Sequence, residues 1–476
     1  MPAILILVPL FGVMALNLMP GKFGRRVAFW FAAGIFAIQI ALAVLKGHVI
    51  WSGALDRFDT LFRLKFSGDN LSFITLLCIG IVSLTSLIIS RCTIRDEKES
   101  FKFINILIIA SIGMCGIVMV DDIFSLYVFL EISAIASFIL IAFSKDINGL
   151  EGSFKYLMLS AVATVLMLAS IAILLLTSSG TGFSVLRNAV ALSRNSYMIT
   201  FAIGLFLSGL FIKGGLVPFH GWLPDAYSAA PAPVSILLAG VMTKVCGVYT
   251  LMRLTSSVFG FTEPIKNILL LVGTLSIIVG AFAALGQNNF KRMLAYSSIS
   301  QVGYLIVGIG TGTALGMMGA AFHLFNHAIF KTLLFVNSAA LEKETGTNSM
   351  DRMGGLSYRM PVTGTTSVIA MLSACGVPPL AGFWSKLLII IALWQTAHYS
   401  YAVIAIMASV LTLAYFLYMQ RQIFFGKLKS GFENLKEACP ENTITASLLA
   451  GITIAAGVAF PFVYNYFLVQ IKDIIR

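Results

Sequence analysis

Seven ionisable side chains stand out because each lies inside an apolar segment of the 476-residue sequence. A charge at the centre of a membrane helix costs about 2.5–3.5 kcal/mol on insertion scales, so such residues usually mark an ion path or a proton relay. Only one of the seven is acidic, so the cations are not neutralised in pairs. The seven are Glu131, Lys213, Lys244, His323, His327, Lys331 and Lys386.

Glu131 and Lys213 form the expected charge pair. Glu131 lies near the middle of SLYVFLEISAIASFIL, where a carboxylate needs a cationic partner or a proton. A contact between the two side chains at about 4 Å gives about 4 kcal/mol at an effective dielectric of 20. While the pair is closed, Lys213 keeps its proton. When the pair opens, burial disfavours the charged form of the amine and the proton can leave. The alternative is a Glu131 that only fastens helices together.

His323, His327 and Lys331 recur every four residues in AFHLFNHAIFKTLLF and therefore share one face of a helix. Imidazoles both give and accept protons near neutral pH, so this row can pass a proton along. Lys244 lies too far from both ends of its segment for easy snorkelling and is a candidate receiver of the proton from Lys213. A metal held by the two histidines is a competing interpretation, but the segment supplies no acid or cysteine to complete the shell. Simple packing of the histidines is another.

The segments that carry these residues have the composition of a membrane protein. Hydrophobic residues make up 58% of the chain and charged residues 11%, far below the roughly 25% of a soluble protein. The apolar runs are about 20 residues long, which suits a membrane-spanning helix, and strand-like alternation is absent. We therefore predict an all-α polytopic membrane protein. About fourteen helices are expected, at 3–20, 27–46, 70–90, 102–120, 122–143, 154–177, 198–217, 233–253, 266–286, 293–311, 315–341, 361–393, 400–420 and 442–470.

Prolines interrupt two of these helices beside buried lysines. Pro218 follows Lys213 in FIKGGLVPFHGWLPDAYSAAPAPVS, and Pro378 and Pro379 precede Lys386 in SACGVPPLAGFWSKLLII. Proline removes a backbone donor, which a membrane helix tolerates only where protein or water supplies other partners. One interrupted helix in each half is typical of transporters whose two halves meet at a site near the membrane midplane.

The remaining composition narrows the function classes. Lys and Arg are more frequent in the odd-numbered loops, which predicts that these loops face the cytoplasm and that both termini lie outside. The net charge of +12 is therefore a topology signal and does not indicate nucleic-acid binding. The six cysteines form no CxxC or Cys/His cluster, so we expect no metal or iron–sulfur centre. A phosphate-binding GxxxxGK[ST] loop is absent, which excludes ATP-driven transport by this chain alone. The first apolar run has no basic segment before it, which predicts an uncleaved first helix.

The motifs together resemble the antiporter-like membrane subunits of respiratory complex I, Mrp cation/proton antiporters and membrane-bound energy-converting hydrogenases. The resemblance covers residues 102–420 and includes Glu131 in its apolar helix, FKRMLAYSSISQVGYLIVGIG and the histidine and proline motifs quoted above. It implies fourteen helices in two five-helix inverted repeats, with helices 7 and 12 broken. The implied parts are residues 1–101 with three helices, 102–253 and 254–420 as the two repeats, and 421–476 as a cytoplasmic loop and last helix.

The resemblance also implies roles for the buried residues. Glu131 and Lys213 would form the pair that couples to a neighbouring subunit, and Lys244 would be the central relay. His323, His327 and Lys331 would connect the two halves, and Lys386 would be the exit-side group.

We therefore expect a proton-translocating component of a multi-subunit complex in the cell (inner) membrane, driven by electron transfer in a partner. This chain would hold no cofactor and no catalytic site, whereas partner subunits would carry iron–sulfur, flavin or nickel–iron centres. The first alternative is a component of an Mrp-type Na⁺(K⁺)/H⁺ antiporter without redox chemistry. The second is a structural scaffold, against which four buried lysines and a single acid argue, because docking would favour matched charges.

Overall fold

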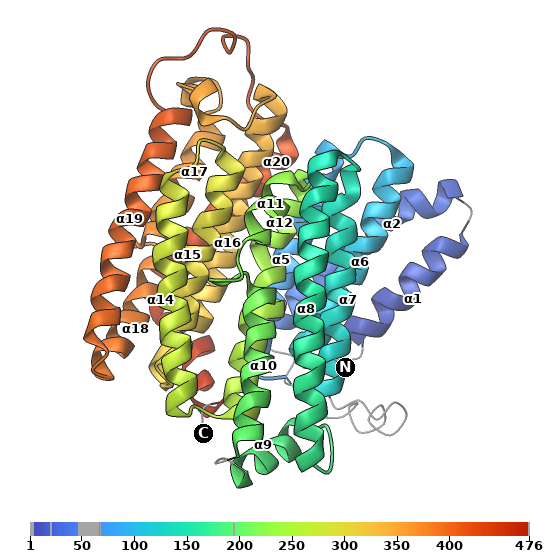
Figure 1. Ribbon diagram of the computed structural model, residues 1–476. Helices are drawn as coiled ribbons and strands as arrows, with labels where there is room; N and C mark the ends of the chain where they lie inside the picture. Colours follow the sequence, from blue (N-terminus) through green and yellow to red (C-terminus); the bar gives the residue numbers. More distant parts are fainter. Residues whose placement is uncertain (1–3, 20, 46–65, 67, 194–195, 475–476) are drawn as a thin grey trace.

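The computed structural model describes residues 4–19, 21–45, 66, 68–193 and 196–474 and consists of long helices packed side by side (Figure 1). Within these residues, twelve helices are long and apolar enough to cross a membrane. Within these described residues β-structure is limited to three isolated bridges between loops. The prediction of an all-α multi-pass protein is confirmed. The expected connection at 47–69 lies mostly outside the described residues.

Four of the first helices begin at an aspartate. Asp69, Asp96, Asp122 and Asp146 each accept a hydrogen bond from a backbone N–H of the following turn, which satisfies a donor that the helix leaves free. Asp146 starts its helix seven residues before the predicted 154, because the first two turns are polar and escaped the apolar pattern. The helices of this part are α1 (Ile4–Leu18), α2 (Gly21–Val44), α5 (Asn70–Thr93), α6 (Glu97–Met119), α7 (Ile123–Ile141) and α8 (Ile147–Thr177).

A short amphipathic helix, α9 (Phe183–Leu192), lies in what the sequence predicted as a plain connection. Its buried residues Phe183, Leu186 and Val190 line one side, but ten residues with Arg187 among them are too short and too polar for a membrane span. The chain then continues through α10 (Tyr197–Gly214) and α11 (Trp222–Ala229). The next long span comprises α12 (Ala232–Leu237), η2 (Leu238–Met242), η3 (Lys244–Tyr249), α13 (Thr250–Leu254) and η4 (Thr255–Phe259), in which η2, η3 and η4 are π-helical.

The second half contains α14 (Glu263–Leu285), α15 (Phe290–Gly310), α16 (Ala314–Thr345), α17 (Pro361–Cys375), α18 (Ala381–Gln395), α19 (Tyr399–Ile423) and α20 (Pro440–Val458). The prediction of one last helix over 442–470 is wrong, because α20 ends at Val458 and the chain continues through the short segments α21 (Phe460–Val463), η7 (Tyr464–Leu468) and η8 (Val469–Ile474). The predicted part boundaries after residues 101, 253 and 420 each fall inside a helix, since helix ends are less apolar than helix centres.

The two broken helices stop in the same way. Gly215 ends α10 and Gly376 ends α17, both with the positive φ that favours glycine. In each case the residue after the glycine donates its N–H to a carbonyl five residues earlier, from Leu216 to Phe211 and from Val377 to Leu372. This is the Schellman pattern, and the prolines that follow prevent the helix from resuming at once. The expectation of broken helices 7 and 12 is therefore met.

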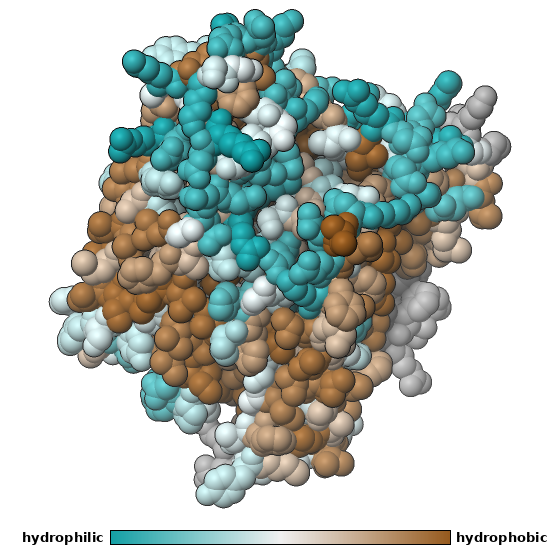
Figure 2. Space-filling view, turned by 45° about the horizontal axis from the view of Figure 1, so that its top comes forward, coloured by the Kyte–Doolittle hydropathy of each residue, from teal (hydrophilic) through white to brown (hydrophobic). Residues whose placement is uncertain are grey.

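Among the described spans the most buried are the long span from α12 to η4, α15 and α16 (Figure 1). Both chain ends lie in the lower half of this view, and the odd-numbered loops gather at the upper end. Figure 2 shows that the upper end is hydrophilic, whereas the sides below it are hydrophobic. The buried charged residues therefore sit inside a bundle whose outer belt suits lipid.

Candidate functional site

Glu131 and Lys213 meet at one side of the bundle, brought together by α7, α10 and α8. The Lys213 Nζ lies 3.0 Å from Glu131 Oε1 and donates a second hydrogen bond to Ser160 Oγ at 2.8 Å. Thr164 donates its hydroxyl to the same Glu131 oxygen at 2.7 Å. The Lys213 side chain is 1% exposed and the Glu131 side chain 26% exposed. The amine is therefore inside the bundle, while the carboxylate reaches its surface.

Lys244 lies at the centre, in the π-helical segment η3, and is fully buried. Its ammonium donates to the backbone carbonyl of Ala239. Segment η3 touches α10 backbone to backbone, since a Cβ added at Gly247 would lie 2.4 Å from the Cα of Gly214. Lys213 and Lys244 thus lie on helices in direct contact, although each amine is held by its own partners.

His323, His327 and Lys331 lie on one side of α16 and are fully buried. The two imidazole rings stack with centroids 6.1 Å apart and an interplanar angle of 17°. Lys331 donates to the Leu294 carbonyl at 3.0 Å and to the Ser297 hydroxyl. Helix α16 packs against the span that carries Lys244, since a Cβ added at Gly240 would lie 2.5 Å from Thr332 Oγ1. The connecting row and the central lysine are therefore close enough to influence each other's charge.

Lys386 lies at the other end of the row. It donates to the Ala374 carbonyl at 2.8 Å, in the last turn of α17, where the helix dipole favours a cation. Its Nζ lies 4.5 Å from the centre of the Tyr304 ring, and the Tyr304 hydroxyl bonds to Ser409 Oγ at 2.9 Å. The neighbouring Ser385 joins Lys386 to the row, because its hydroxyl bonds to His323 Nδ1 at 2.9 Å.

Several buried polar atoms along this line have no partner in the protein. They include both ring nitrogens of His327, Nε2 of His323, both amide atoms of Gln301 and the hydroxyl of Tyr415. Buried polar groups are normally satisfied by protein or by ordered water, so this line is polar enough to hold water. We call this group of buried polar residues the central seam. It comprises Lys244, Ser297, Gln301, Tyr304, His323, His327, Lys331, Ser385, Lys386 and Ser409.

The metal interpretation of the two histidines is not supported by the geometry. His323 uses Nδ1 for Ser385, and in the described part of the chain no cysteine, aspartate or glutamate groups with the two rings. A zinc site needs at least three protein ligands, and two stacked imidazoles supply only two. The residues therefore suit proton transfer better than metal binding.

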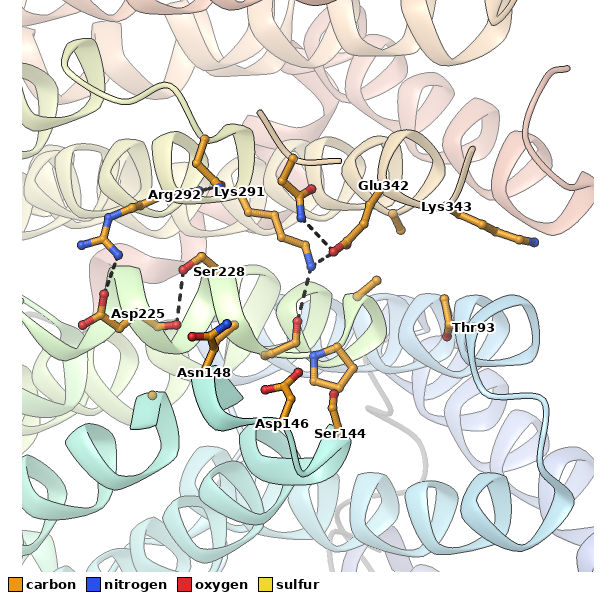
Figure 3. A pocket seen from close by; sticks show the side chains of 18 of the residues that line it. Thr93, Ser144, Asp146, Asn148, Asp225, Ser228, Lys291, Arg292, Glu342 and Lys343 are labelled. Atoms are coloured by element: carbon orange, nitrogen blue, oxygen red, sulfur yellow. Dashed lines mark hydrogen bonds and ion pairs between the residues drawn. The ribbon is translucent and has the colours of Figure 1, made fainter. Parts of the chain in front are cut away.

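A pocket of about 830 Å³ opens at the hydrophilic end of the bundle (Figure 3). Lys291 and Glu342 point toward each other in it, with Nζ and Oε2 2.6 Å apart. Asp225 accepts a hydrogen bond from Arg292 at 2.5 Å and another from Lys155 at 2.7 Å. Lys291 also starts the helix whose Leu294 and Ser297 hold Lys331. The pocket and the central seam are therefore joined by α15.

Lys291 and Arg292 are not among the candidate site residues predicted from the sequence. In the structure the Lys291 side chain is 3% exposed and paired with Glu342 on α16, 51 residues away. The likewise unpredicted pair of Arg253 with Asp69 has contacts of 2.6 and 2.8 Å. Neither pairing has a local signal, because the partners come from helices whose packing the sequence does not specify.

Comparison with known proteins places these features in one family. Residues 120–412 match the model described as "NADH:quinone oxidoreductase/Mrp antiporter, TM". The chain is 31% identical over 455 residues to a Na(+)/H(+) antiporter subunit from Alkalihalophilus pseudofirmus, covering 94% of this chain and 91% of that protein. It is also 31% identical over 436 residues to an NADH-quinone oxidoreductase subunit from Desulforudis audaxviator, covering 87% of this chain and 85% of that protein.

Solved structures agree on the fold. A chain of the Mrp complex from Dietzia sp. superimposes with a TM-score of 0.89 at 20% identity, covering 100% of this chain and 97% of that one. A chain of the membrane-bound sulfane sulfur reductase, an archaeal respiratory membrane complex, gives 0.88 at 25% identity with the same coverage. With its buried charges and these similarities, the chain belongs to the NADH:quinone oxidoreductase/Mrp antiporter transmembrane family, as an antiporter-like component of multi-subunit membrane complexes.

Proposed function

We propose that this chain conducts protons along the central seam, between the Glu131–Lys213 pair and Lys386. The observation that carries the proposal is the burial of six basic side chains, each 0–3% exposed, with a single acid beside them. Buried charges are costly and persist where they serve transport. A scaffold would need matched ion pairs, and Lys244, Lys331 and Lys386 instead bind neutral carbonyls and hydroxyls.

The proposed mechanism depends on repulsion between neighbouring cations. Lys244, His327 and Lys331 cannot all be protonated at low cost, because each positive charge disfavours the others. A proton that arrives at one site therefore promotes release from the next. Separation of Glu131 from Lys213 would start the transfer, because the amine then loses the charge that stabilises its proton. Water bridging the unpaired ring nitrogens would carry the proton between side chains.

Protons are proposed to enter at the pocket beside Lys291 and Glu342. The pocket lies at the end where the basic odd-numbered loops gather, which we assign to the cytoplasm, so both termini face outside. From Lys291, the first helical turns of α15 lead to Leu294 and Ser297, the partners of Lys331. Lys386 remains the proposed exit-side group.

Two five-helix inverted repeats are proposed to form the path. With the observed helix ends, they would comprise residues 97–259 and 263–423, each with one helix broken at a glycine. Such an arrangement places the paired breaks near the membrane midplane.

The energy source is proposed to be electron transfer in partner subunits of a complex in the cell membrane, with cofactors held by those partners. A relative named as a quinone oxidoreductase subunit supports this interpretation. The second candidate is exchange of Na⁺ or K⁺ against protons without redox chemistry. It is favoured by the relative named as a Na(+)/H(+) antiporter subunit, whose match covers more of the chain, 94% against 87%.

Transport in inverted membrane vesicles containing the intact complex tests the proposal. A pH-sensitive dye would report acidification after addition of an electron donor, or dissipation of an imposed pH gradient after addition of Na⁺ or K⁺. A response to the electron donor identifies a redox-driven complex, and a response to Na⁺ or K⁺ identifies a cation/proton antiporter. Lys244→Ala should abolish the response in either case, with assembly checked by co-purification. Undiminished transport by an assembled Lys244→Ala complex would refute proton conduction through the seam.

A further inference from the structure

Two thiols and a carboxylate meet where α5 ends and α20 begins. Cys92 lies in the last turn of α5, Cys439 is the N-cap residue of α20, and Glu441 follows in the first turn of α20. The Cys92 Sγ lies 3.6 Å from Glu441 Oε2, and the three ligand atoms all lie within 4.8 Å of one another. Among the described residues this is the only such group of three His, Cys, Asp or Glu side chains. The transport path does not use it.

These distances suit a tetrahedral metal site. Zinc binds thiolate sulfur at about 2.3 Å and carboxylate oxygen at about 2.0–2.2 Å, so a tetrahedral sulfur–oxygen edge is about 3.6 Å. The separation of Cys92 Sγ and Glu441 Oε2 already equals that edge. A further oxygen, Asn442 Oδ1, lies 3.3 Å from Cys439 Sγ. Cys92 also lines the pocket that opens at this end of the bundle, so water can reach the site. A fourth ligand can thus come from Asn442 or from water.

We propose that Cys92, Cys439 and Glu441 form a binding site for a soft divalent cation of the zinc class. Thiolates select such ions over Mg²⁺ and Ca²⁺, which prefer oxygen ligands. In the orientation proposed above this end faces the cytoplasm, where thiols stay reduced. Cys92 and Cys439 are partly exposed and lie together, whereas the other four cysteines, at positions 78, 115, 246 and 375, are buried singly inside the bundle.

The bound ion would fasten α5 to α20. Helix α5 packs against α12 and α16, and α20 packs against α16, α17 and α18, so the site joins two helices that flank the histidine-bearing α16. The expected role is a clamp that holds the surroundings of the seam together. The ligands are partly exposed, so the ion can be exchanged without unfolding the bundle.

Metal titration of the purified intact complex tests the site. After treatment with a chelator, Zn²⁺ would be added in competition with a chromophoric zinc indicator, and Cd²⁺ would be followed by its ultraviolet thiolate charge-transfer absorption. The wild-type complex should bind one more equivalent than a Cys92→Ser/Cys439→Ser complex, and excess Mg²⁺ should not displace it. Glu441→Gln should weaken binding at least about tenfold, comparable with the larger effects of disturbing a metal site. Cys375→Ser, which removes a buried thiol, should bind like the wild type.

Alkylation provides a second measurement that does not depend on a variant. Zn²⁺ should protect Cys92 and Cys439 from a maleimide reagent, as read by mass spectrometry of their peptides. Equal metal uptake by the wild type and the double serine variant would overturn the proposal. So would alkylation of Cys92 and Cys439 that is unchanged by Zn²⁺, including the case in which an oxidant joins the two as a disulfide. Neither result bears on proton conduction, which the Lys244→Ala experiment tests separately.

Discussion

Replacing Glu131 with glutamine removes the charge partner of Lys213 with little change in shape. At the observed 3.0 Å the attraction is about 5.5 kcal/mol at an effective dielectric of 20. The Glu131 side chain is 26% exposed, so part of this is screened, and about 3 kcal/mol is a suitable lower value for breaking such a pair. Since 1.4 kcal/mol corresponds to a factor of ten, a loss of about 3 kcal/mol makes the closed arrangement of these two side chains about a hundredfold less favourable.

Transport should fall accordingly if this pair starts each transfer. The assay is the initial rate of proton movement into inverted vesicles, normalised to the amount of assembled complex. We expect Glu131→Gln to retain less than about a tenth of the wild-type rate, because the charge pair that starts each transfer can no longer form. Thr164→Val is the matched control, because it removes a hydrogen bond to Glu131 Oε1 but keeps both charges.

A double-mutant cycle separates pairing from independent effects. If the two side chains act together, Lys213→Ala combined with Glu131→Gln should be no worse than Lys213→Ala alone. A Glu131→Gln complex that assembles normally and transports at more than half the wild-type rate would refute the reasoning. If the losses of transport rate in the two single variants simply add in the double variant, Glu131 and Lys213 do not act together.

Three further predictions concern the seam and its support. Ser385→Ala removes the hydrogen-bond partner of His323 Nδ1. The loss of a hydrogen bond worth about 1.5 kcal/mol should slow proton transport about tenfold. An unchanged transport rate would show that Ser385 is not part of the path. Gly247→Ala should destabilise the bundle by about 1–3 kcal/mol, because the new Cβ would clash with the Gly214 backbone. Gly451→Ala is the control and should not destabilise it, because the space around Gly451 is open. Thermal melting of the two variants measures the difference. Burial raises the pKa of Asp69, but the Coulombic attraction and hydrogen bonds of Arg253 outweigh it and leave the pKa lowered. The stabilisation is therefore complete above the ordinary value of about 3.9 and is lost as the pH falls through the lowered pKa. Asp69→Asn should melt lower than the wild type at pH 7, with the difference disappearing in acid, and a pH-independent difference would contradict this.

Much of the fold was predictable because membrane helices carry their signal locally. Apolar runs of membrane length located nearly every span, and Pro218 and Pro378 located both breaks. The unpredicted elements lacked that signal. Helix α9 is short and amphipathic, and the polar start of α8 depends on the Asp146 cap. The end of α20 at Val458 did have a local signal, Pro461 three residues later, but the apolar run that continues past it was interpreted as one helix.

The candidate site was predictable where a charge inside an apolar run is itself the signal. That reasoning located Glu131, Lys213 and Lys386 without any knowledge of their neighbours. It could not supply the neutral partners, such as Ser160 and Ser385, because a serine in a membrane helix carries no signal until tertiary packing brings an amine or imidazole to it. The same limit hid the pairs across the pocket, whose members lie on different helices.

Two lysines on α16 provide the most direct test of proton conduction through the seam. Lys331 is fully buried and bound to Leu294 and Ser297, whereas Lys343 is exposed near the end of the same helix. Proton flux would be measured for assembled complexes carrying Lys331→Met or Lys343→Met, each of which removes one charge from α16. The account predicts that flux is lost with Lys331→Met and retained with Lys343→Met. Wild-type flux through a Lys331→Met complex would contradict it.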